Sequence, residues 1–531
     1  MPMASIWYKR RMRGTRGYHR LGRRDLAAFA AAFAAGCVGG ARSPRGLPRA
    51  GGGGEKLIAA GTPEPIWGVQ SGDVSSSRAV IWSRSDRPSR MIVEWSTSPK
   101  LTAADVRRVV GPMVTQGGGL VAKAALDGLP AGARVHYRVR FEGERASEWL
   151  TGALSTPPES ADRREADVVL AWSGDTNGQG WGIDESRGGM PAYTALLERA
   201  PDFFVSCGDA IYADGPILPE VALPDGTVWR NLVTETKSHP AETLEDFRGN
   251  HLYSRLSREV RALTAQVPSF AIWDDHEVRN NWFPGDPRFD ALAVHARRAM
   301  LEHTPTLIDP AGVMYRSFRW GPLLEVFLLD GRSHRTPNHP APAQEAFLGA
   351  AQLAWLEGAL ARSTATWKII ASNMPVGLVV SEPAPGAPEI EAFDGFANGN
   401  GAPHGREDEL VALLSSLKRR GVRNVVWLTA DVHYAAAHRY DPARAVFKDM
   451  DPFWEFIAGP MHATSFPRKR LDDTFGPELV YASARGDTFG SPADGAQYFG
   501  VIRIDGKTRT MTVSLVDGRG RDLHATVLRP A

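Results

Sequence analysis

The chain has 531 residues, more than one hydrophobic core usually holds, so two domains are expected. Its composition, 43% hydrophobic and 23% charged, is typical of a globular protein with a well-buried core. Residues 1–50 hold eleven Lys or Arg and one acidic residue, whereas the remainder holds 51 basic and 59 acidic residues. A mildly acidic body lacks the basic face of a nucleic-acid-binding protein, so nucleic acid is not an expected partner except as a substrate.

Residues 1–54 have the order of a bacterial export signal followed by a linker. An arginine-rich stretch at 9–24 precedes a short apolar run at 26–36 and then small residues. The run is shorter than the about 20 residues that span a bilayer. The pair Arg23-Arg24 resembles a twin-arginine leader, which is used by proteins exported already folded. We therefore expect export machinery as a partner and a periplasmic or secreted location; the alternative is a disordered basic tail.

The chain contains two cysteines. Cys37 follows Ala-Ala-Gly, so it is a candidate for a lipid-modified residue that anchors the protein. Cys207 then has no partner, and it is interpreted as a small buried hydrophobic residue rather than a metal ligand. A fold held together by disulfides is therefore excluded.

Residues 62–158 are predicted to form an N-terminal β-sandwich domain. Segments 78–84, 91–96 and 135–141 alternate apolar and polar residues and are rich in β-branched and aromatic types. Turn clusters separate about seven such short strands. The stretch 127–140, closed by Thr156-Pro157-Pro158, resembles the last strands of a fibronectin type III or immunoglobulin-like domain.

Residues 166–531 are predicted to form an α/β catalytic domain. Apolar runs of strand length end in polar turns at 166–172, 202–206, 270–273, 324–329, 367–371 and 424–428. Helical patterns lie between them, including 352–362 and 407–420, the latter ending at Gly421. Residues 498–528 are expected to add closing strands to the same central sheet. In such sheets ligands bind beyond the carboxyl ends of the strands.

Polar residues follow five of these strands. They are Asp175; Asp209, Tyr212 and Asp214; Asp274, Asp275, His276, Asn280 and Asn281; Asp330; and Asp431 with His433. Carboxylates gathered at one rim repel each other unless a cation compensates them. Oxygen ligands suit hard cations, and histidine adds affinity for iron, manganese or zinc. The pattern predicts a metal centre.

Each of these residues also has a simpler explanation when taken alone. An aspartate after a strand is commonly a helix cap or a turn former, which suffices for Asp214 and Asp330. A lone histidine such as His433 is commonly a hydrogen-bonded core residue. The conjunction of Asp-x-His, Gly-Asp-x-x-Tyr and Asp-Asp-His-Glu, each after an apolar strand, favours a shared site. A pair of metal ions can clamp a phosphate and activate a water, and Asp209 is our candidate to bridge them.

The ordered motifs resemble the PhoD-type alkaline phosphatases, within the calcineurin-like metallophosphoesterases. They are SGD at 71–73 with Val80-Ile81-Trp82, then GDAIYAD, IWDDHEVRNNW, LDGRSHR and ADVHY, and the resemblance covers residues 65–528. It implies an immunoglobulin-like N-terminal domain, an αββα catalytic core and twin-arginine export. It further implies phosphoester hydrolysis at an iron–calcium type centre, without a phosphoserine intermediate.

The resemblance also assigns residues. Its metal-binding positions match Asp209, Tyr212, Asp275, one or both of Asn280 and Asn281, Asp431 and His433. His276 is the candidate to donate a proton or hold the phosphate, and Arg279 is a catalytic candidate for a phosphate contact. Arg332 is a second candidate for a phosphate contact. One departure is clear: this chain has Ser173-Gly174-Asp175 where family members present Ser-Cys-Gln, whose thiolate binds iron. Asp175 replaces that soft ligand with a hard one, which puts iron in question and leaves manganese or zinc beside calcium as candidates.

The resulting hypothesis is an exported, monomeric phosphoester hydrolase in which a metal-activated hydroxide attacks phosphorus in line. Two alternatives remain open. The same centre would serve a phosphodiesterase or phospholipase, and a chain without bound metal would be a catalytically decayed exported binding protein. A serine hydrolase is excluded because the chain contains no G-x-S-x-G motif.

Overall fold

The computed structural model describes residues 61–102, 105–159, 166–309, 311–339, 342, 344–384, 387–484 and 487–531. Residues 57–531 form one compact unit. The expected export signal and linker at 1–54, with Arg23-Arg24 and Cys37, lie outside the described residues. None of the helices in the described ranges is both long and apolar enough to cross a membrane.

The N-terminal region forms seven strands within its described residues. They are β1 (Val69–Gly72), β2 (Arg78–Arg84), β3 (Ser89–Ser96), β4 (Arg107–Val114), β5 (Val121–Asp127), β6 (Arg134–Glu142) and β7 (Leu150–Ser155). One sheet has the order β4-β3-β6-β7, and β1-β2-β5 form the second set. One apolar core contains Ile81 of β2, Val93 of β3 and Val139 of β6. Burial alternates along β6, as its sequence predicts.

The second set of strands continues into the catalytic region. Its nine-stranded sheet has the order β26-β25-β24-β8-β9-β12-β1-β2-β5. The further strands are β8 (Val168–Ser173), β9 (Phe203–Cys207), β12 (Ser269–Ile272), β24 (Tyr498–Ile504), β25 (Met511–Asp517) and β26 (Asp522–Leu528). Strands β8, β9 and β12 run parallel, whereas β24 joins β8 antiparallel.

A second large sheet has seven strands in the order β13-β14-β15-β19-β21-β20-β23. These are β13 (Arg316–Trp320), β14 (Leu324–Leu328), β15 (Trp367–Ala371), β19 (Val425–Thr429), β20 (Ala436–Tyr440), β21 (Phe453–Ile457) and β23 (Pro477–Ala482). The six strands predicted after residue 166 are all present, with ends within two residues of those expected. The single central sheet expected from the strand pattern is wrong, because these strands divide equally between two sheets, as in the αββα core that the resemblance implies. Apolar runs that are buried on both faces do not encode which sheet they join.

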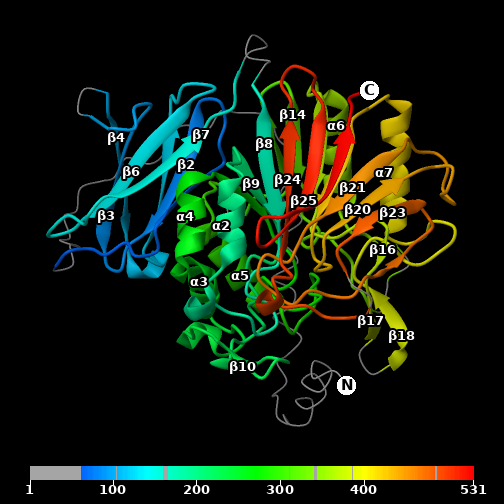
Figure 1. Ribbon diagram of the computed structural model, residues 1–531, viewed down its shortest axis with the longest axis horizontal. Helices are drawn as coiled ribbons and strands as arrows, with labels where there is room; N and C mark the ends of the chain where they lie inside the picture. Colours follow the sequence, from blue (N-terminus) through cyan, green and yellow to red (C-terminus); the bar gives the residue numbers. More distant parts are fainter. Residues whose placement is uncertain are drawn as a thin grey trace, which may run out of the picture. The chain divides into compact units, whose positions relative to one another are not determined.

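Helices cover the outer face of each large sheet (Figure 1). The helices α2 (Pro191–Glu198) and α4 (Arg258–Gln266) pack on the nine-stranded sheet, and α6 (Ala350–Arg362) and α7 (Glu407–Arg419) pack on the other. Between the sheets, Leu170 and Phe203 share a core with Ile369. The expected helix–sheet–sheet–helix architecture is therefore present. The helices α3 (Leu244–Tyr253) and α5 (Asp290–His303) pack against each other beside β12.

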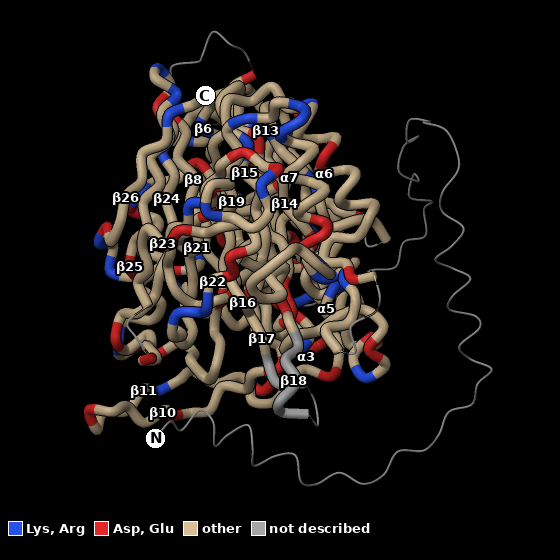
Figure 2. The backbone as a smooth tube through the Cα atoms, turned by 90° about the vertical axis from the view of Figure 1, so that its right-hand side faces the viewer, with Lys and Arg blue, Asp and Glu red and all other residues tan. Residues whose placement is uncertain are grey.

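Three two-stranded ribbons complete the fold. They are β10 (Glu220–Ala222) with β11 (Val228–Arg230), β16 (Leu378–Val379) with β22 (Arg470–Leu471), and β17 (Ser381–Ala384) with β18 (Ala387–Phe393). Figure 2, viewed from the side of α6 and α7, shows Lys and Arg positions interspersed with Asp and Glu positions.

The first residue of α7, Glu407, forms a buried carboxyl pair with Asp472. Glu407 is completely buried, and its two oxygens accept hydrogen bonds from the backbone N–H groups of Asn398 and His404, each at 3.2 Å. Asp472 accepts from the Thr474 backbone at 2.9 Å. Burial, followed by the charge of Asp472, raises the pKa of Glu407 from 4.5 to about 8.

We expect this pair to make stability depend on pH in the alkaline range. Because the folded pKa of Glu407 lies above its unfolded value, the stabilisation is complete below pH 4.5 and is lost as pH rises through about 8. A Glu407→Gln variant cannot ionise. Its Tm should match that of the wild type at pH 5 and exceed it at pH 9, as measured by calorimetry. A Tm difference that stays constant between these pH values would contradict the assignment.

Candidate metal centre

The predicted ligands follow strands of both sheets and meet where those strands end. Several of them adopt left-handed backbone conformations, with φ values of 63° at Asp175, 48° at Asp209, 55° at Asn281, 64° at Asp431 and 60° at His433. Such a conformation costs a non-glycine residue about 1–3 kcal/mol and tends to cluster at functional sites. Asp, Asn and His tolerate it better than other residue types. The turns therefore bend sharply enough to aim these side chains at one point.

The strand ends approach one another closely. A Cβ atom on Gly174 would lie 2.9 Å from the Ala430 Cβ and 3.0 Å from the Gly208 carbonyl oxygen. Only glycine fits this contact between the loop after β8, the loop after β9 and the loop after β19. Gly174 therefore allows loops from two different sheets to place their aspartates side by side.

Three overlapping groups of side chains have ligand atoms within 4.8 Å of one another. They are Asp175, Asp209 and His433; Asp209, Asp275 and His276; and Asp274, Asp275 and Asp431. Asp209 belongs to the first two groups, and Asp275 links the second to the third. This overlap is the arrangement expected of two neighbouring cations that share a carboxylate.

His433 is oriented by hydrogen bonds on both ring nitrogens. Its Nδ1 lies 2.5 Å from the carbonyl oxygen of Thr464, an acceptor, so the proton of the neutral ring resides on Nδ1. The lone pair on Nε2 then faces the Tyr212 hydroxyl at 2.8 Å and the Asp175 Oδ1 at 3.5 Å. Burial lowers the pKa of His433 to about 3, which keeps the ring neutral. A neutral imidazole with a directed Nε2 is the form that binds metal.

The carboxylates of the cluster are buried without enough partners. Both oxygens of Asp175 are buried and accept no hydrogen bond. Burial, followed by neighbouring charges, raises the pKa values of Asp175, Asp209 and Asp431 well above their usual range. A buried carboxylate with two orphaned oxygens is costly, and a cation would compensate it. The residues present therefore fit a bound metal.

His276 lies at the more open side of the cluster. Its Nδ1 is 2.8 Å from Asp214 Oδ1, and its backbone N–H donates to Asp209 Oδ1 at 3.2 Å. Burial opposes protonation, but the charges of Asp214, Asp275 and Asp274 outweigh it and raise the pKa of His276 to about 10. Asp214 also accepts from the Asn280 backbone at 2.7 Å. Asp214 is therefore a turn former that additionally orients His276.

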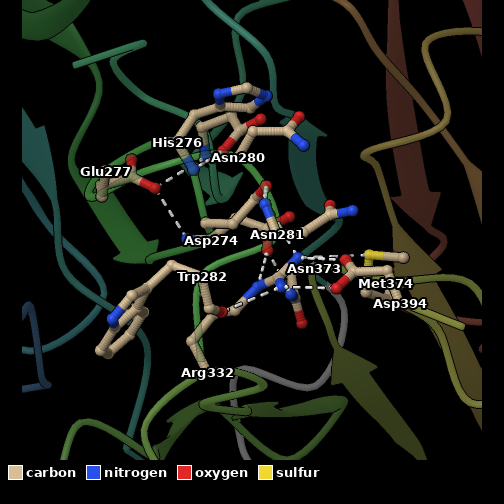
Figure 3. A network of polar contacts seen from close by, with 12 residues as sticks. Asp274, His276, Glu277, Asn280, Asn281, Trp282, Arg332, Asn373, Met374 and Asp394 are labelled. Atoms are coloured by element: carbon tan, nitrogen blue, oxygen red, sulfur yellow. Dashed lines mark hydrogen bonds and ion pairs between the residues drawn. The ribbon is translucent and has the colours of Figure 1, made fainter. Parts of the chain in front are cut away.

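A buried arginine neutralises part of the cluster (Figure 3). The Arg332 guanidinium is completely buried and donates to Asp274 Oδ1 at 2.5 Å and to Asp394 Oδ2 at 2.7 Å. It also lies 3.3 Å from Asp275 Oδ1. Arg332 thus stabilises the acidic loops from behind. The expectation that it pairs with a phosphate oxygen is wrong, because its donors are already directed at carboxylates.

Comparison with known proteins decides the family. The PhoD-like phosphatase model matches residues 170–515, and the model of its N-terminal domain matches residues 57–158. The chain belongs to the PhoD-like phosphatase family. Alkaline phosphatase D of Bacillus subtilis (strain 168) is 26% identical over 398 residues, which is 69% of this chain and 64% of that relative. The match therefore spans slightly less than two thirds of the relative's length.

Solved structures agree with this placement. A PhoD structure superposes with a TM-score of 0.65 at 19% identity, covering 90% of each chain. A purple acid phosphatase from yellow lupin (Lupinus luteus) seeds superposes with a TM-score of 0.52 at 10% identity, covering 88% of this chain and 74% of that one. These likenesses show a metallophosphoesterase-like fold. The matched family is one of phosphatases, and the three ligand groups suit divalent metal ions.

In this PhoD-like phosphatase the two candidate asparagines differ in position. The Asn281 backbone N–H donates to Asp275 Oδ2, whereas Asn280 is exposed beside His276 (Figure 3). Asn281 therefore contacts a candidate ligand through its backbone N–H. Arg279 donates to the carbonyls of Val278 and Ala241, so the structure does not place its guanidinium on the carboxylates.

Two further predicted positions have structural contacts. Asp330 Oδ1 accepts from the Trp273 indole at 2.8 Å and from the Ser333 backbone at 2.9 Å, which is the contact set of a turn former. Cys207 is buried in the core between the sheets, where burial raises the pKa of its thiol.

Sequence analysis missed three buried residues that support the centre. Glu277 accepts from the backbones of Ala210 and Asp274, each at 2.7 Å, and so joins the loops after β9 and β12. Asn373 donates to Asp274 Oδ1 at 2.5 Å. Asp394 binds Arg332. Asn373 follows the predicted strand at 367–371 and was detectable on that ground. Asp394 follows the ribbon strand β18, which was not predicted, and carries no comparable signal.

Proposed function

We propose that this PhoD-like phosphatase hydrolyses phosphate esters at the acidic cluster described above, using two bound metal ions. The observation that carries the proposal is the Asp175 carboxylate, which is buried beside Asp209 and His433 with both oxygens unsatisfied. Family membership supplies the reaction class. The overlap of three ligand groups at Asp209 and Asp275 supports two ions rather than one.

The candidate ligands form two sets, one for each ion. Asp175, Tyr212 and His433 would hold one ion, and Asp275, Asn281 and Asp431 would hold the other, with Asp209 shared. When bound, such ions act as Lewis acids that neutralise phosphate charge and lower the pKa of water. The protein's own part is to fix the ligands: Thr464 sets the His433 tautomer, and Glu277 holds the loop that carries Asp209.

His276 is our candidate for a proton donor. Its Nδ1–H is directed at Asp214, so Nε2 is the nitrogen available to a substrate. A protonated ring hydrogen-bonds a phosphate oxygen and passes the Nε2 proton to the departing alkoxide. Asp214 orients the ring and stabilises its charged form, as the carboxylate does in histidine–aspartate pairs.

The identity of the metals follows from the donor atoms. Asp175 supplies oxygen where the family presents a thiolate, and Cys207 remains in the core. Carboxylate, amide and phenol oxygens favour calcium, and the imidazole of His433 admits manganese or zinc. We therefore propose calcium with manganese or zinc as the second ion, in place of the iron implied by the family resemblance.

Two further proposals concern the rest of the chain. The leader at 1–54 directs export to the periplasm or beyond, and Cys37 offers a lipid anchor. The strands β1–β7, which share one core, constitute an immunoglobulin or fibronectin III-like sandwich.

Removal of the bound metal by a chelator should abolish activity and lower the stability of the protein. Metal-loaded protein, purified from its export compartment, is expected to hydrolyse p-nitrophenyl phosphate, and dialysis against EDTA should abolish turnover and lower Tm, because a ligand that binds only the folded state stabilises it. Elemental analysis then identifies the ions, and re-addition of Ca²⁺, Mn²⁺, Zn²⁺ or Fe³⁺ ranks them by recovered rate.

Bis-(p-nitrophenyl) phosphate separates the two ester classes. Faster turnover of the diester would establish a phosphodiesterase on the same centre. Protein that contains no metal and shows no Tm change with EDTA would contradict the proposal and favour a binding protein.

A further inference from the structure

Two aromatic rings extend outward from the metal centre. Phe466 stacks on the His433 ring, with centroids 4.2 Å apart and planes inclined by 2°. Phe489 packs edge-on against Phe466, with centroids 6.0 Å apart and planes at 78°. Phe466 is half-buried, whereas Phe489 is 54% exposed. We call this pair the aromatic ledge.

We propose that the aromatic ledge binds the organic group of the substrate, so that the site prefers phosphate esters of flat aromatic groups. This inference rests on the proposed phosphoesterase function and specifies its substrate class. Exposed apolar residues are common on protein surfaces. Phe489 differs from a scattered surface residue because its ring packs against Phe466, which in turn stacks on the candidate metal ligand His433.

The backbone holds the ledge in place. The Phe466 N–H donates to the His433 carbonyl at 3.1 Å, and Thr464 accepts from the His433 ring. Ser465 and Gly490 exchange two backbone hydrogen bonds of 3.0 Å, which join the loop of Phe466 to the loop of Phe489. Both rings are therefore positioned before any ligand arrives, and a preorganised surface binds at a lower entropic cost.

Two basic residues lie next to the ledge in the sequence, and a positive charge would suit a phosphate ester. Arg468 and Lys469 follow Phe466 in the chain, and the Lys469 backbone donates to the Tyr434 hydroxyl at 3.2 Å. The face of an aromatic side chain stacks on a flat ring whatever substituents that ring carries. An alkyl group makes only ordinary apolar contact with the same face. A substrate whose phosphate reaches the metals and whose ring lies on Phe489 would use both features.

The test compares aromatic and alkyl esters on one variant. Phe489→Ala should lower kcat/KM about tenfold for phenyl phosphate and for 5′-AMP, chiefly through KM, because stacking acts on the bound ground state as well as the transition state. The kcat/KM for ethyl phosphate should change less than about twofold. Val110→Ala, which removes an exposed apolar side chain from β4, is the matched control and should change none of these values.

Comparing the substrates also identifies which kind of ring the ledge binds. A loss for 5′-AMP alone assigns the ledge to a nucleobase, a loss for phenyl phosphate alone assigns it to aryl esters, and a loss for both supports flat rings in general. An equal loss for ethyl phosphate, or no loss for any ester, would overturn the inference. Metal content is measured in each variant, since an altered centre would mimic an equal loss.

A binding measurement keeps the ledge separate from turnover. Phenylphosphonate and ethylphosphonate contain no ester to hydrolyse, and calorimetry of the metal-loaded protein gives their Kd values. Phe489→Ala should weaken phenylphosphonate about tenfold and leave ethylphosphonate unchanged. If the wild type hydrolyses no ester yet shows this difference, the proposed function fails and the ledge stands. If the two phosphonates respond alike, the ledge fails whatever the activity.

Discussion

An Asp209→Asn variant is expected to lose metal and turnover together. The substituted amide retains a carbonyl oxygen for the His276 backbone N–H, so the loop should remain folded. The substitution removes the charge shared by two of the three ligand groups. Metal-ion stabilisation of a phosphoryl transition state is several kcal/mol, so a loss of about 10³-fold in kcat/KM on p-nitrophenyl phosphate is expected.

A second readout separates metal loss from misfolding. Without metal, Asp209→Asn should have a higher Tm than the wild type, because one of several repelling buried carboxylates is gone. Added metal should raise the Tm of the wild type but not of the variant. Asp330→Asn is the matched control: it changes a strand-end aspartate outside the three groups and should keep its metal. Undiminished activity in Asp209→Asn would remove the basis for a bridging role.

The replacement Arg332→Met should have the largest effect on stability. It leaves the Asp274 carboxylate buried without its cation, whereas Asp394 keeps Arg335 at 3.2 Å. Removing one partner of a buried ion pair costs about 3–5 kcal/mol. We expect Tm to fall by ~4 °C in metal-free protein, measured by calorimetry.

Two companion variants make that result specific. Adding Asp274→Asn to Arg332→Met should restore about 1 kcal/mol or more, since the unpaired charge is removed with its partner. Arg279→Met, whose guanidinium contacts only two backbone carbonyls among its described hydrogen bonds, should cost about 1 kcal/mol. Equal losses for Arg279→Met and Arg332→Met would show that the buried network has no special role.

Local sequence signals predicted much of the catalytic region. Apart from Asn281, each candidate ligand lies within five residues of an apolar strand, and the turn chemistry of Asp209 or Asp431 is visible without the fold. Sequence did not assign strands to sheets, because β9 and β15 are both apolar runs of five residues with no mark of the sheet they enter.

The supporting residues were harder to predict for a different reason. Arg332 contacts Asp274 from 58 positions away and Asp394 from 62. A charged residue in a loop is usually exposed, and only the folded chain shows that this one faces three acids. The role of Arg332 depends on partners that are distant in the sequence. The role of a metal ligand, by contrast, could partly be predicted from the residues next to it in the chain.

The continuous nine-stranded sheet has a consequence for how the chain is divided. Gly72 of β1 pairs with Ser269 of β12, five residues before Asp274, and the Gln70 amide donates to the Ser269 hydroxyl at 2.6 Å. The Trp82 indole and the Lys123 ammonium reach carbonyls at the end of α5 and just beyond it. A cut between residues 159 and 166 separates the two family matches in sequence but severs a shared sheet in space. Excised alone, the phosphatase part would present β12 as an unpaired edge, open to pairing with other chains.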